Sequence, residues 1–314
     1  MSALRRLPLL LVPALLSVSL AACGDDAAPA EPTNERLDAV TISGEVGDEP
    51  EVTWKSQMSA GKIESETLVT GDGATLEDGD QVLAHLWIGN GFIEDKAFST
   101  HDKDATAELV SVDESLPPFL AAVKGATIGS RIAVTSSAEE AFGPAGNSQL
   151  GIGNKDSVLV IIDLASGIAD PPSGTRPPAP AWVPKIEFKK GVISGFDFAG
   201  TPEPTEDLKE SVLFDGDGAV VEEGNAIVVK YLGQVYDAKK PFDENFSTGT
   251  PTSFAIGTGG VIKGWDKTLV GKKVGTRLII AVPPKLGYGE AGNTDAGIKP
   301  TDTLYFLIDI LATA

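Results

Sequence analysis

Side chains that commonly carry acid–base, metal or nucleophilic chemistry are sparse in this chain. Its only histidines are His85 and His101, and its only cysteine is Cys23. The segment 101–104, His-Asp-Lys-Asp, could be read as a set of metal ligands, but its charged context is more typical of a solvated loop. We therefore predict no metal site.

Acidic, glycine-rich segments offer a second possible chemistry. Asp72 with Gly73, and the segment 215–218, Asp-Gly-Asp-Gly, resemble fragments of calcium loops but lack the remaining ligands at EF-hand spacing. Asp-Gly is typical of hairpin turns, so we expect turns at both places. No Gly-x-Ser-x-Gly, phosphate loop or dinucleotide fingerprint stands at a strand-to-helix turn, which argues against hydrolases and kinases. We predict no cofactor.

The chain contains an internal repeat. Residues 65–74 match residues 210–219 at an offset of 145, and the offset is 146 from Gly125 and Gly271 through Asp163 and Asp309. A nearly constant register predicts two homologous domains, at 36–167 and 185–314. The proline-rich stretch 168–184 between them predicts an extended linker.

Within each unit the pattern is that of strands around one short helix. Segments rich in β-branched and aromatic residues predict central strands of the second unit at 226–232, 277–282 and 303–310. Between them, Trp265 and Leu269 stand four residues apart, so a helix from Gly264 to Val270 would lay both on the sheet. Phe119 and Val123 repeat this spacing in the first unit. We predict an α+β fold, with two antiparallel curled sheets, each wrapped around a short helix.

About a dozen spaced positions of the second unit follow one pattern. They are Val228-Val229-Lys230-Tyr231-Leu232-Gly233, Pro241-Phe242-Asp243, Phe254, Gly257, Val261-Ile262-Lys263-Gly264-Trp265-Asp266, Val274-Gly275, Tyr288-Gly289, Ile298 and Asp302-Thr303-Leu304-Tyr305-Phe306. Over roughly residues 205 to 312, this pattern resembles the FKBP-type peptidyl-prolyl cis-trans isomerase family. The resemblance implies a half-barrel sheet around a helix whose tryptophan forms the floor of a pocket.

The resemblance also implies the residues of that pocket. Catalytic roles fall to Asp243, Tyr288 and Tyr231, and substrate would contact Phe242, Phe254, Val261, Ile262, Trp265, Ile298 and Phe306. The sequence departs from the family at Thr252, where many members have an aromatic residue, and in the loop 289–299, which lacks a proline. The alternative is that these aromatic residues only form a core.

The residue types suit prolyl isomerisation. Rotation about an X-Pro amide faces a barrier of about 18–20 kcal/mol and needs no nucleophile. The planar amide is more dipolar than the twisted one, so water stabilises it more strongly. An apolar pocket that removes this water therefore disfavours the planar form relative to the twisted form. Tyr288 would hold the carbonyl before proline, while Asp243 would lie against the rotated carbonyl or orient Tyr231.

In the first unit, the polar residues of the pattern are replaced. Tyr231 aligns with Leu86, Trp265 with Phe119 and Tyr288 with Phe142, while neither Ala97 nor Ser99 supplies an aspartate. We therefore predict a degenerate FKBP-like domain with weak or no isomerase activity at 36–167. It would bind chains, position the second domain, contact a partner or serve as a spacer.

The amino terminus has the features of an export signal. Residues 1–22 combine Arg5 and Arg6 with an apolar run of 14 residues, Leu7 to Leu20, which is too short to span a bilayer as a mature helix. Cys23 follows Leu-Ala-Ala and precedes Gly24, which resembles the lipobox of bacterial lipoproteins. We predict lipidation of Cys23, an acidic tether at 23–35 and an extracytoplasmic protein anchored to the cell membrane. The alternative is an ordinary secretory signal.

Composition limits the remaining classes. A formal charge of −20 repels phosphate backbones, so we expect no nucleic-acid partner, and one cysteine allows no internal disulfide. The expected partners are X-Pro segments of exported polypeptides and a macrolide immunosuppressant, bound by a monomer. Two functions remain open. One is an isomerase that assists the folding of exported proteins, and the other is a non-catalytic chaperone or scaffold lipoprotein that binds apolar segments.

Overall fold

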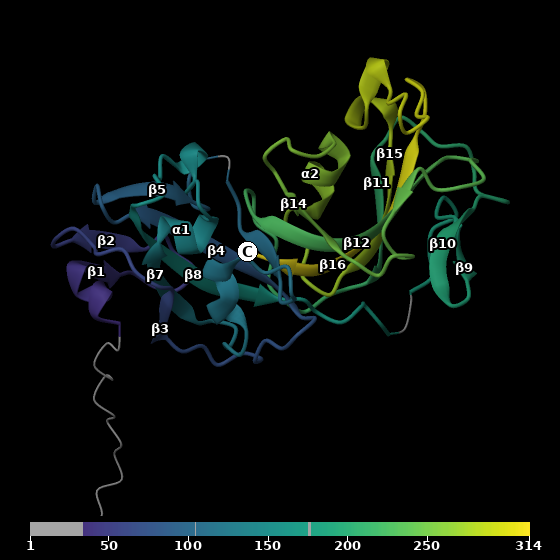
Figure 1. The fold of residues 1–314 in the computed structure, drawn as a ribbon. Coiled ribbons are helices and arrows are strands. Elements are labelled where there is room, and N and C mark those ends of the chain that lie inside the picture. The colour runs from purple at the N-terminus through teal and green to yellow at the C-terminus, as the bar shows by residue number, and fades with distance from the viewer. Residues whose placement is uncertain (1–33, 104, 175–176) are drawn as a thin grey trace, which may run out of the picture. The chain divides into compact units, whose positions relative to one another are not determined.

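A computed structural model describes residues 34–103, 105–174 and 177–314 (Figure 1). The predicted signal peptide at 1–22, Cys23 and most of the tether at 23–35 therefore lie outside the described residues. Within the described ranges, no helix combines the length and apolar character needed to cross a membrane.

The first repeat forms a six-stranded antiparallel sheet. Its strands lie in the order β3-β7-β8-β4-β5, and β6 also pairs with β4. The strands are β3 (Glu64–Val69), β4 (Gln81–Asn90), β5 (Asp95–Ser99), β6 (Glu108–Ser111), β7 (Arg131–Ser137) and β8 (Ser157–Gly167). The helical elements are short: η2 (Pro118–Val123), α1 (Ala138–Phe142) and η3 (Ser148–Leu150).

The second repeat has the same topology. Its order is β11-β15-β16-β12-β13, and β14 pairs with β12. The strands are β11 (Lys209–Phe214), β12 (Ala226–Val235), β13 (Asp243–Glu244), β14 (Thr252–Ala255), β15 (Arg277–Val282) and β16 (Leu304–Thr313), with helices α2 (Lys263–Leu269), η4 (Pro284–Leu286) and η5 (Gly289–Ala291). The predicted α+β fold of two antiparallel curled sheets is confirmed.

Each sheet also carries a hairpin that precedes it in sequence. In the first domain the hairpin is β1 (Val40–Ser43) and β2 (Glu51–Trp54), which follow η1 (Glu35–Ala39), and in the second it is β9 (Lys185–Lys189) and β10 (Val192–Asp197). These hairpins are not among the elements predicted from the sequence.

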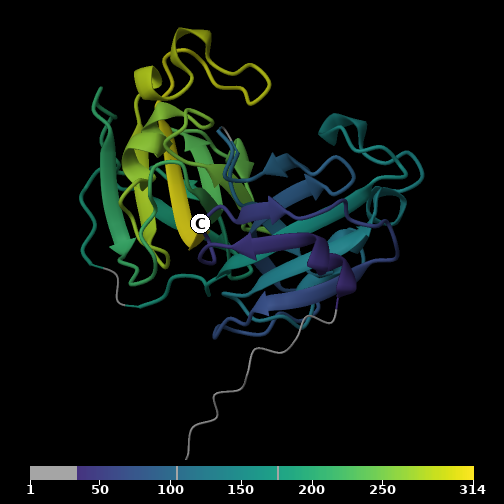
Figure 2. The ribbon, with the colours of Figure 1, turned by 90° about the vertical axis from the view of Figure 1, so that its left-hand side faces the viewer.

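The hairpin of the second domain gives its sheet a second buried face. Residues of α2 pack on one face of the sheet, while Ile193 and Phe196 of β10 join the core on the other face (Figures 1 and 2). Every residue of β16 is therefore buried. A strand covered on both faces can be apolar on both, which explains why β16 is apolar at nearly every position and why its one charged residue, Asp309, is paired.

The two short helices over the sheets differ in kind. Trp265 and Leu269 of α2 are both buried, as their spacing predicts. In the first domain the counterpart η2 is a 3₁₀ helix of 6 residues that begins at Pro118, directly after another proline. Short helical segments with few internal hydrogen bonds commonly adopt this tighter form.

The Asp-Gly segments do not form the hairpin turns that we expected. Strand β11 pairs with β15, not with β12, so residues 215–218 do not close a hairpin. A Cβ atom on Gly216 would lie 2.2 Å from the carbonyl oxygen of Val274. Glycine is therefore required there because two backbones pass in contact.

Both domains keep a buried ion pair between their last two central strands. In the first domain, Arg131 donates to both carboxylate oxygens of Asp163 at 2.7 Å, and each side chain is 2% exposed. Arg131 also donates to backbone carbonyls of the β1–β2 loop, including that of Glu45 at 2.8 Å. In the second domain, Arg277 and Asp309 form the same bidentate pair. Removal of one partner would leave a buried charge without its counterion, which is strongly destabilising.

We expect Arg131→Met to lower the free energy of unfolding of the first domain by about 3–5 kcal/mol, because the Asp163 carboxylate stays buried without its partner. The matched control is Lys124→Met, which breaks an exposed pair with Asp78 and should cost less than about 1 kcal/mol. Urea denaturation of the full chain, followed by tryptophan fluorescence, measures both. Equal small losses would show that the buried pair has no special role.

Candidate functional site

A cavity of about 510 Å³ opens between α2 and the sheet of the second domain. Its wall is mostly apolar and aromatic, with a carboxylate, a lysine and two tyrosines among the lining side chains. The lining residues are Tyr231, Phe242, Asp243, Phe254, Gly259, Gly260, Val261, Ile262, Lys263, Trp265, Gly287, Tyr288 and Phe306. Such an apolar cavity with a few polar groups is typical of a binding site for a small apolar group.

Helix α2 positions the floor of the cavity. A Cβ atom on Gly264 would lie 2.6 Å from Cγ1 of Val282, so glycine lets the helix lie directly on the sheet. Trp265, the next residue, is 4% exposed. Asp266 accepts hydrogen bonds from the N–H groups of Gly257 at 2.7 Å and Gly259 at 3.1 Å. The helix therefore also holds the loop 257–262 that forms one wall.

Three aromatic rings meet Trp265 edge to face, and a fourth joins them through Phe306. The Trp265 ring lies 5.5 Å from Tyr231, 5.4 Å from Phe254 and 5.4 Å from Phe306, measured between centroids. Phe242 extends the cluster through Phe306 at 5.7 Å. Edge-to-face pairs are favourable beyond their buried area, so the rings hold one another in a fixed shape. The cavity is therefore formed before any ligand binds.

Tyr231 and Asp243 are joined at the mouth of the cavity. The Tyr231 hydroxyl donates to Oδ2 of Asp243 at 2.5 Å. Partial burial, followed by the hydrogen bond to Asp243 and its charge, raises the pKa of Tyr231 well above its usual range. The phenol therefore stays protonated at neutral pH and holds the carboxylate in one orientation.

The side chain of Asn245 holds the backbone of β12 next to this pair. Its role is not among those predicted from the sequence. Its Oδ1 accepts the Tyr231 N–H at 2.7 Å, and its Nδ2 donates to the Val229 carbonyl at 3.1 Å. It is 6% exposed. The only sequence signal is an asparagine two residues after the predicted aspartate. Thr252, the departure from the family pattern, lies outside the lining, and its hydroxyl accepts a hydrogen bond from Asn245 at 3.3 Å.

The structure brings nine of the ten predicted site residues to the cavity. Ile298 does not line it but is 4% exposed within the core cluster that includes Trp265. Tyr288 lies at the rim, 37% exposed. The prediction omitted Lys263 and three glycines, Gly259, Gly260 and Gly287, whose backbones form part of the wall.

The first domain has the same sheet as the second but lacks the polar side chains of the cavity. By strand register, Phe98 takes the place of Asp243, since Phe98 pairs with Ile88 as Asp243 pairs with Gly233. Phe142, the counterpart of Tyr288, packs on Phe119 at 5.2 Å between ring centroids. A separate cavity of about 360 Å³ includes Leu86 but neither Phe119 nor Phe142. The hydroxyl and carboxylate of the second domain thus have no equivalents in these positions.

The two histidines pack together. Their rings stack at 4.2 Å between centroids, and burial, with the charge of His101, lowers the pKa of His85 to about 4. Asp102 pairs with Lys96 at 2.6 Å, while Asp104 lies outside the described residues. Over the ranges that the structure describes, no three histidine, cysteine, aspartate or glutamate residues are grouped as metal ligands.

Comparison with known proteins finds the same family over the second domain. Residues 218–311 match the family model described as FKBP-type peptidyl-prolyl cis-trans isomerase. The chain is 39% identical over 116 residues to the FK506-binding protein of Streptomyces anulatus. The aligned residues make up 37% of this chain and 93% of that protein. It is also 35% identical over 112 residues to the FKBP-type peptidyl-prolyl cis-trans isomerase FkpA of Escherichia coli K12. That match covers 36% of this chain and 40% of FkpA.

A solved structure gives a partial match. The crystal structure of FkpA from Escherichia coli aligns with 40% of this chain and 52% of that chain, at 33% identity and a TM-score of 0.31.

Asn245→Ala should lower the free energy of unfolding of the second domain by about 1–3 kcal/mol, because it leaves the Tyr231 N–H and the Val229 carbonyl without their partner in a buried position. Asn154→Ala is the control, since that amide makes one exposed bond to the Pro144 carbonyl. Urea denaturation measures both. If the two variants lose the same stability, Asn245 is not the support described above.

Proposed function

Because this chain belongs to the FKBP-type peptidyl-prolyl cis-trans isomerase family, we propose that the cavity of its second domain is where it isomerises X-Pro bonds. The chain is 39% identical to a family member of which it covers 93%. The observation that carries the assignment is the aromatic cavity over Trp265 with Asp243 and Tyr288 at its opening. Such a site can bind a proline ring and contact the amide that precedes it.

The mechanism we propose is conformational. The rings of Trp265, Phe242 and Phe306 surround the proline and exclude water from the amide, whose planar form is the more dipolar. Tyr288 donates its hydroxyl to the carbonyl before proline. Asp243, oriented by Tyr231, lies against the carbonyl as it rotates. Binding that is stronger to the twisted amide lowers the barrier of about 18–20 kcal/mol with no covalent step.

We assign no catalysis to the first domain. Phe98 and Phe142 cannot accept or donate the hydrogen bonds that we give to Asp243 and Tyr288. Its proposed role is to bind apolar chain segments or to position the second domain. This leaves a second candidate function for the whole protein, a chaperone that holds apolar segments without turnover. The replaced polar residues of the first domain are the observation in its favour.

The proposed setting is the outer surface of the cell membrane. Residues 1–22 would be removed as a signal peptide and Cys23 would carry the lipid, leaving the described domains outside the cytoplasm. The substrates would be X-Pro segments of exported polypeptides, bound by a monomer. Relatives named for FK506 binding support a macrolide as a ligand of the same cavity.

Asp243→Ala should reduce kcat/KM for a short X-Pro peptide about 10- to 100-fold, if the lost contact is worth about 1.5–3 kcal/mol. Tyr288→Phe should reduce it about 2- to 10-fold for a neutral hydrogen bond. Isomerisation kinetics of the full chain measure both, with FK506 as a competitor.

The matched control is Phe98→Ala, at the position of the first domain that corresponds to Asp243. It should leave kcat/KM unchanged. Full activity of both Asp243→Ala and Tyr288→Phe would remove the proposed site, and inactivity of the folded parent protein would favour the chaperone.

Cys23→Ser should abolish incorporation of labelled palmitate in a bacterial host that processes lipoproteins, and move the protein from the membrane fraction to the soluble exported fraction. Fractionation and labelling of the full precursor measure this. Unlabelled wild-type protein that is exported and soluble would instead identify residues 1–22 as an ordinary secretory signal.

A further inference from the structure

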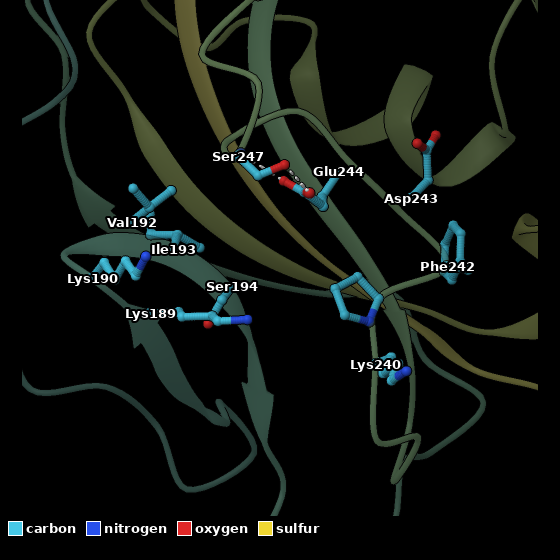
Figure 3. A pocket seen from close by; sticks show the side chains of 11 residues that line it. Lys189, Lys190, Val192, Ile193, Ser194, Lys240, Phe242, Asp243, Glu244 and Ser247 are labelled. Carbon is cyan, nitrogen blue, oxygen red and sulfur yellow. Dashed lines mark hydrogen bonds between the residues drawn. The ribbon is translucent and has the colours of Figure 1, made fainter.

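A second cavity of about 710 Å³ adjoins the catalytic cavity and shares Phe242 and Asp243 with it. One side is the β9–β10 hairpin and the other is the segment 240–247 (Figure 3). We call it the hairpin groove. It is lined by Lys189, Lys190, Val192, Ile193, Ser194, Lys240, Pro241, Phe242, Asp243, Glu244 and Ser247. The two cavities are therefore neighbours along the segment that carries Phe242 and Asp243.

The hairpin is fixed in place at the catalytic strand. Gln234 of β12, which is 1% exposed, accepts the Phe196 N–H at 2.9 Å and donates to the Phe196 carbonyl at 3.1 Å. The same amide donates to the Ala238 carbonyl at 2.8 Å, just before Lys240. One buried side chain thus joins both sides of the groove.

The groove is cationic in a strongly acidic protein. Among the described residues, no carboxylate lies within 4.0 Å of the ammonium groups of Lys189, Lys190 or Lys240. The two acidic side chains of the lining are already held. Glu244 accepts hydrogen bonds from the hydroxyl of Ser247 at 2.6 Å and from its N–H at 2.9 Å, and Asp243 is held by Tyr231. The lining therefore carries one net positive charge, from three lysines against two carboxylates, although the chain carries a formal charge of −20.

Lys190 occupies a position that disfavours lysine. It has φ +53° and Gly191 has φ +84°, and these two residues form the turn between β9 and β10. A two-residue turn with both φ values positive favours Asn-Gly, because asparagine tolerates the left-handed region better than lysine. A lysine there costs some turn stability, and it places a charge beside the groove.

We propose that the hairpin groove binds acidic residues of the substrate next to its X-Pro bond, so that this enzyme prefers prolines in acidic segments. The inference rests on the proposed isomerase function. Val192, Ile193 and Pro241 contact the body of the chain, while the three lysines bind its carboxylates. Each exposed contact between a lysine and a carboxylate contributes modestly, so discrimination comes from the set.

The test compares two X-Pro peptides that differ only in the residues flanking the X-Pro pair. One peptide has three glutamates on each side of the pair, and the other has three glutamines on each side. We expect the full chain to favour the acidic peptide by roughly 3- to 10-fold in kcat/KM, a change that corresponds to less than about 1.4 kcal/mol. The assay must be free of protease, since cleavage would itself depend on flanking charge. The preference should shrink in 1 M salt, which screens exposed charges.

The triple variant Lys189→Gln/Lys190→Asn/Lys240→Gln should lose the preference while its activity on the neutral peptide is retained. Lys190→Asn suits the turn, so the variant should remain folded, as its melting temperature checks. The control Lys55→Gln/Lys62→Gln/Lys155→Gln makes the same change of net charge in the first domain. It should keep the preference.

Anisotropy of the same labelled peptides gives a readout that does not need turnover. If the acidic peptide binds in a lysine-dependent way but is not isomerised, the proposed role of the groove stands and the proposed isomerase function is rejected. Isomerisation of both peptides at equal kcat/KM would retain the isomerase and reject the groove. The groove is also rejected if the groove variant and the control variant lose the preference equally.

Discussion

The distance between α2 and its sheet determines the site of the second domain. A Cβ at Gly264 would meet Val282 at 2.6 Å, so any larger residue would push the helix outward. At the present spacing, Trp265 lies within edge-to-face distance of Tyr231, Phe254 and Phe306. The floor of the cavity follows from that close contact, while the Tyr231–Asp243 pair at the mouth follows from the pairing of β12 with β13. The apolar cavity is therefore a property of backbone packing as much as of the aromatic residues.

The first domain shows that this frame folds without the site. It keeps the strand order and the buried pair of Arg131 with Asp163, while Pro118 stands at the position equivalent to Gly264. Phe142 there packs against Phe119, where the second domain has an open cavity. The strand pairing and the buried ion pair do not depend on the polar residues of the pocket. A duplicated domain can thus change its pocket residues and retain its fold.

The sequence predicts most of what repeats or follows a periodic pattern. The offset of 145–146 residues indicates the two domains, the apolar runs indicate the central strands, and the spacing of Trp265 and Leu269 indicates α2. The sequence does not predict contacts between backbone segments that lie far apart along the chain. Gly216 permits contact with Val274, which no local pattern distinguishes from a turn. Polar and apolar residues do alternate along β9, at 185–189, but the segment is short and turns at Lys190-Gly191, which is not a typical pair for a two-residue turn. The lining of the cavity over Trp265 is foreseen only through the family resemblance.

The hairpin explains how a site of fixed chemistry can acquire selectivity. It precedes residues 218–311, the part that matches the family, and the groove that it lines shares only Phe242 and Asp243 with the cavity over Trp265. The net charge of −20 opposes the approach of an acidic chain, but beyond about 10 Å that repulsion is largely screened at 0.1 M salt. The lysines of the groove act at contact distance. Discrimination by them would therefore arise after encounter, through slower dissociation of acidic chains, and would not require electrostatic steering.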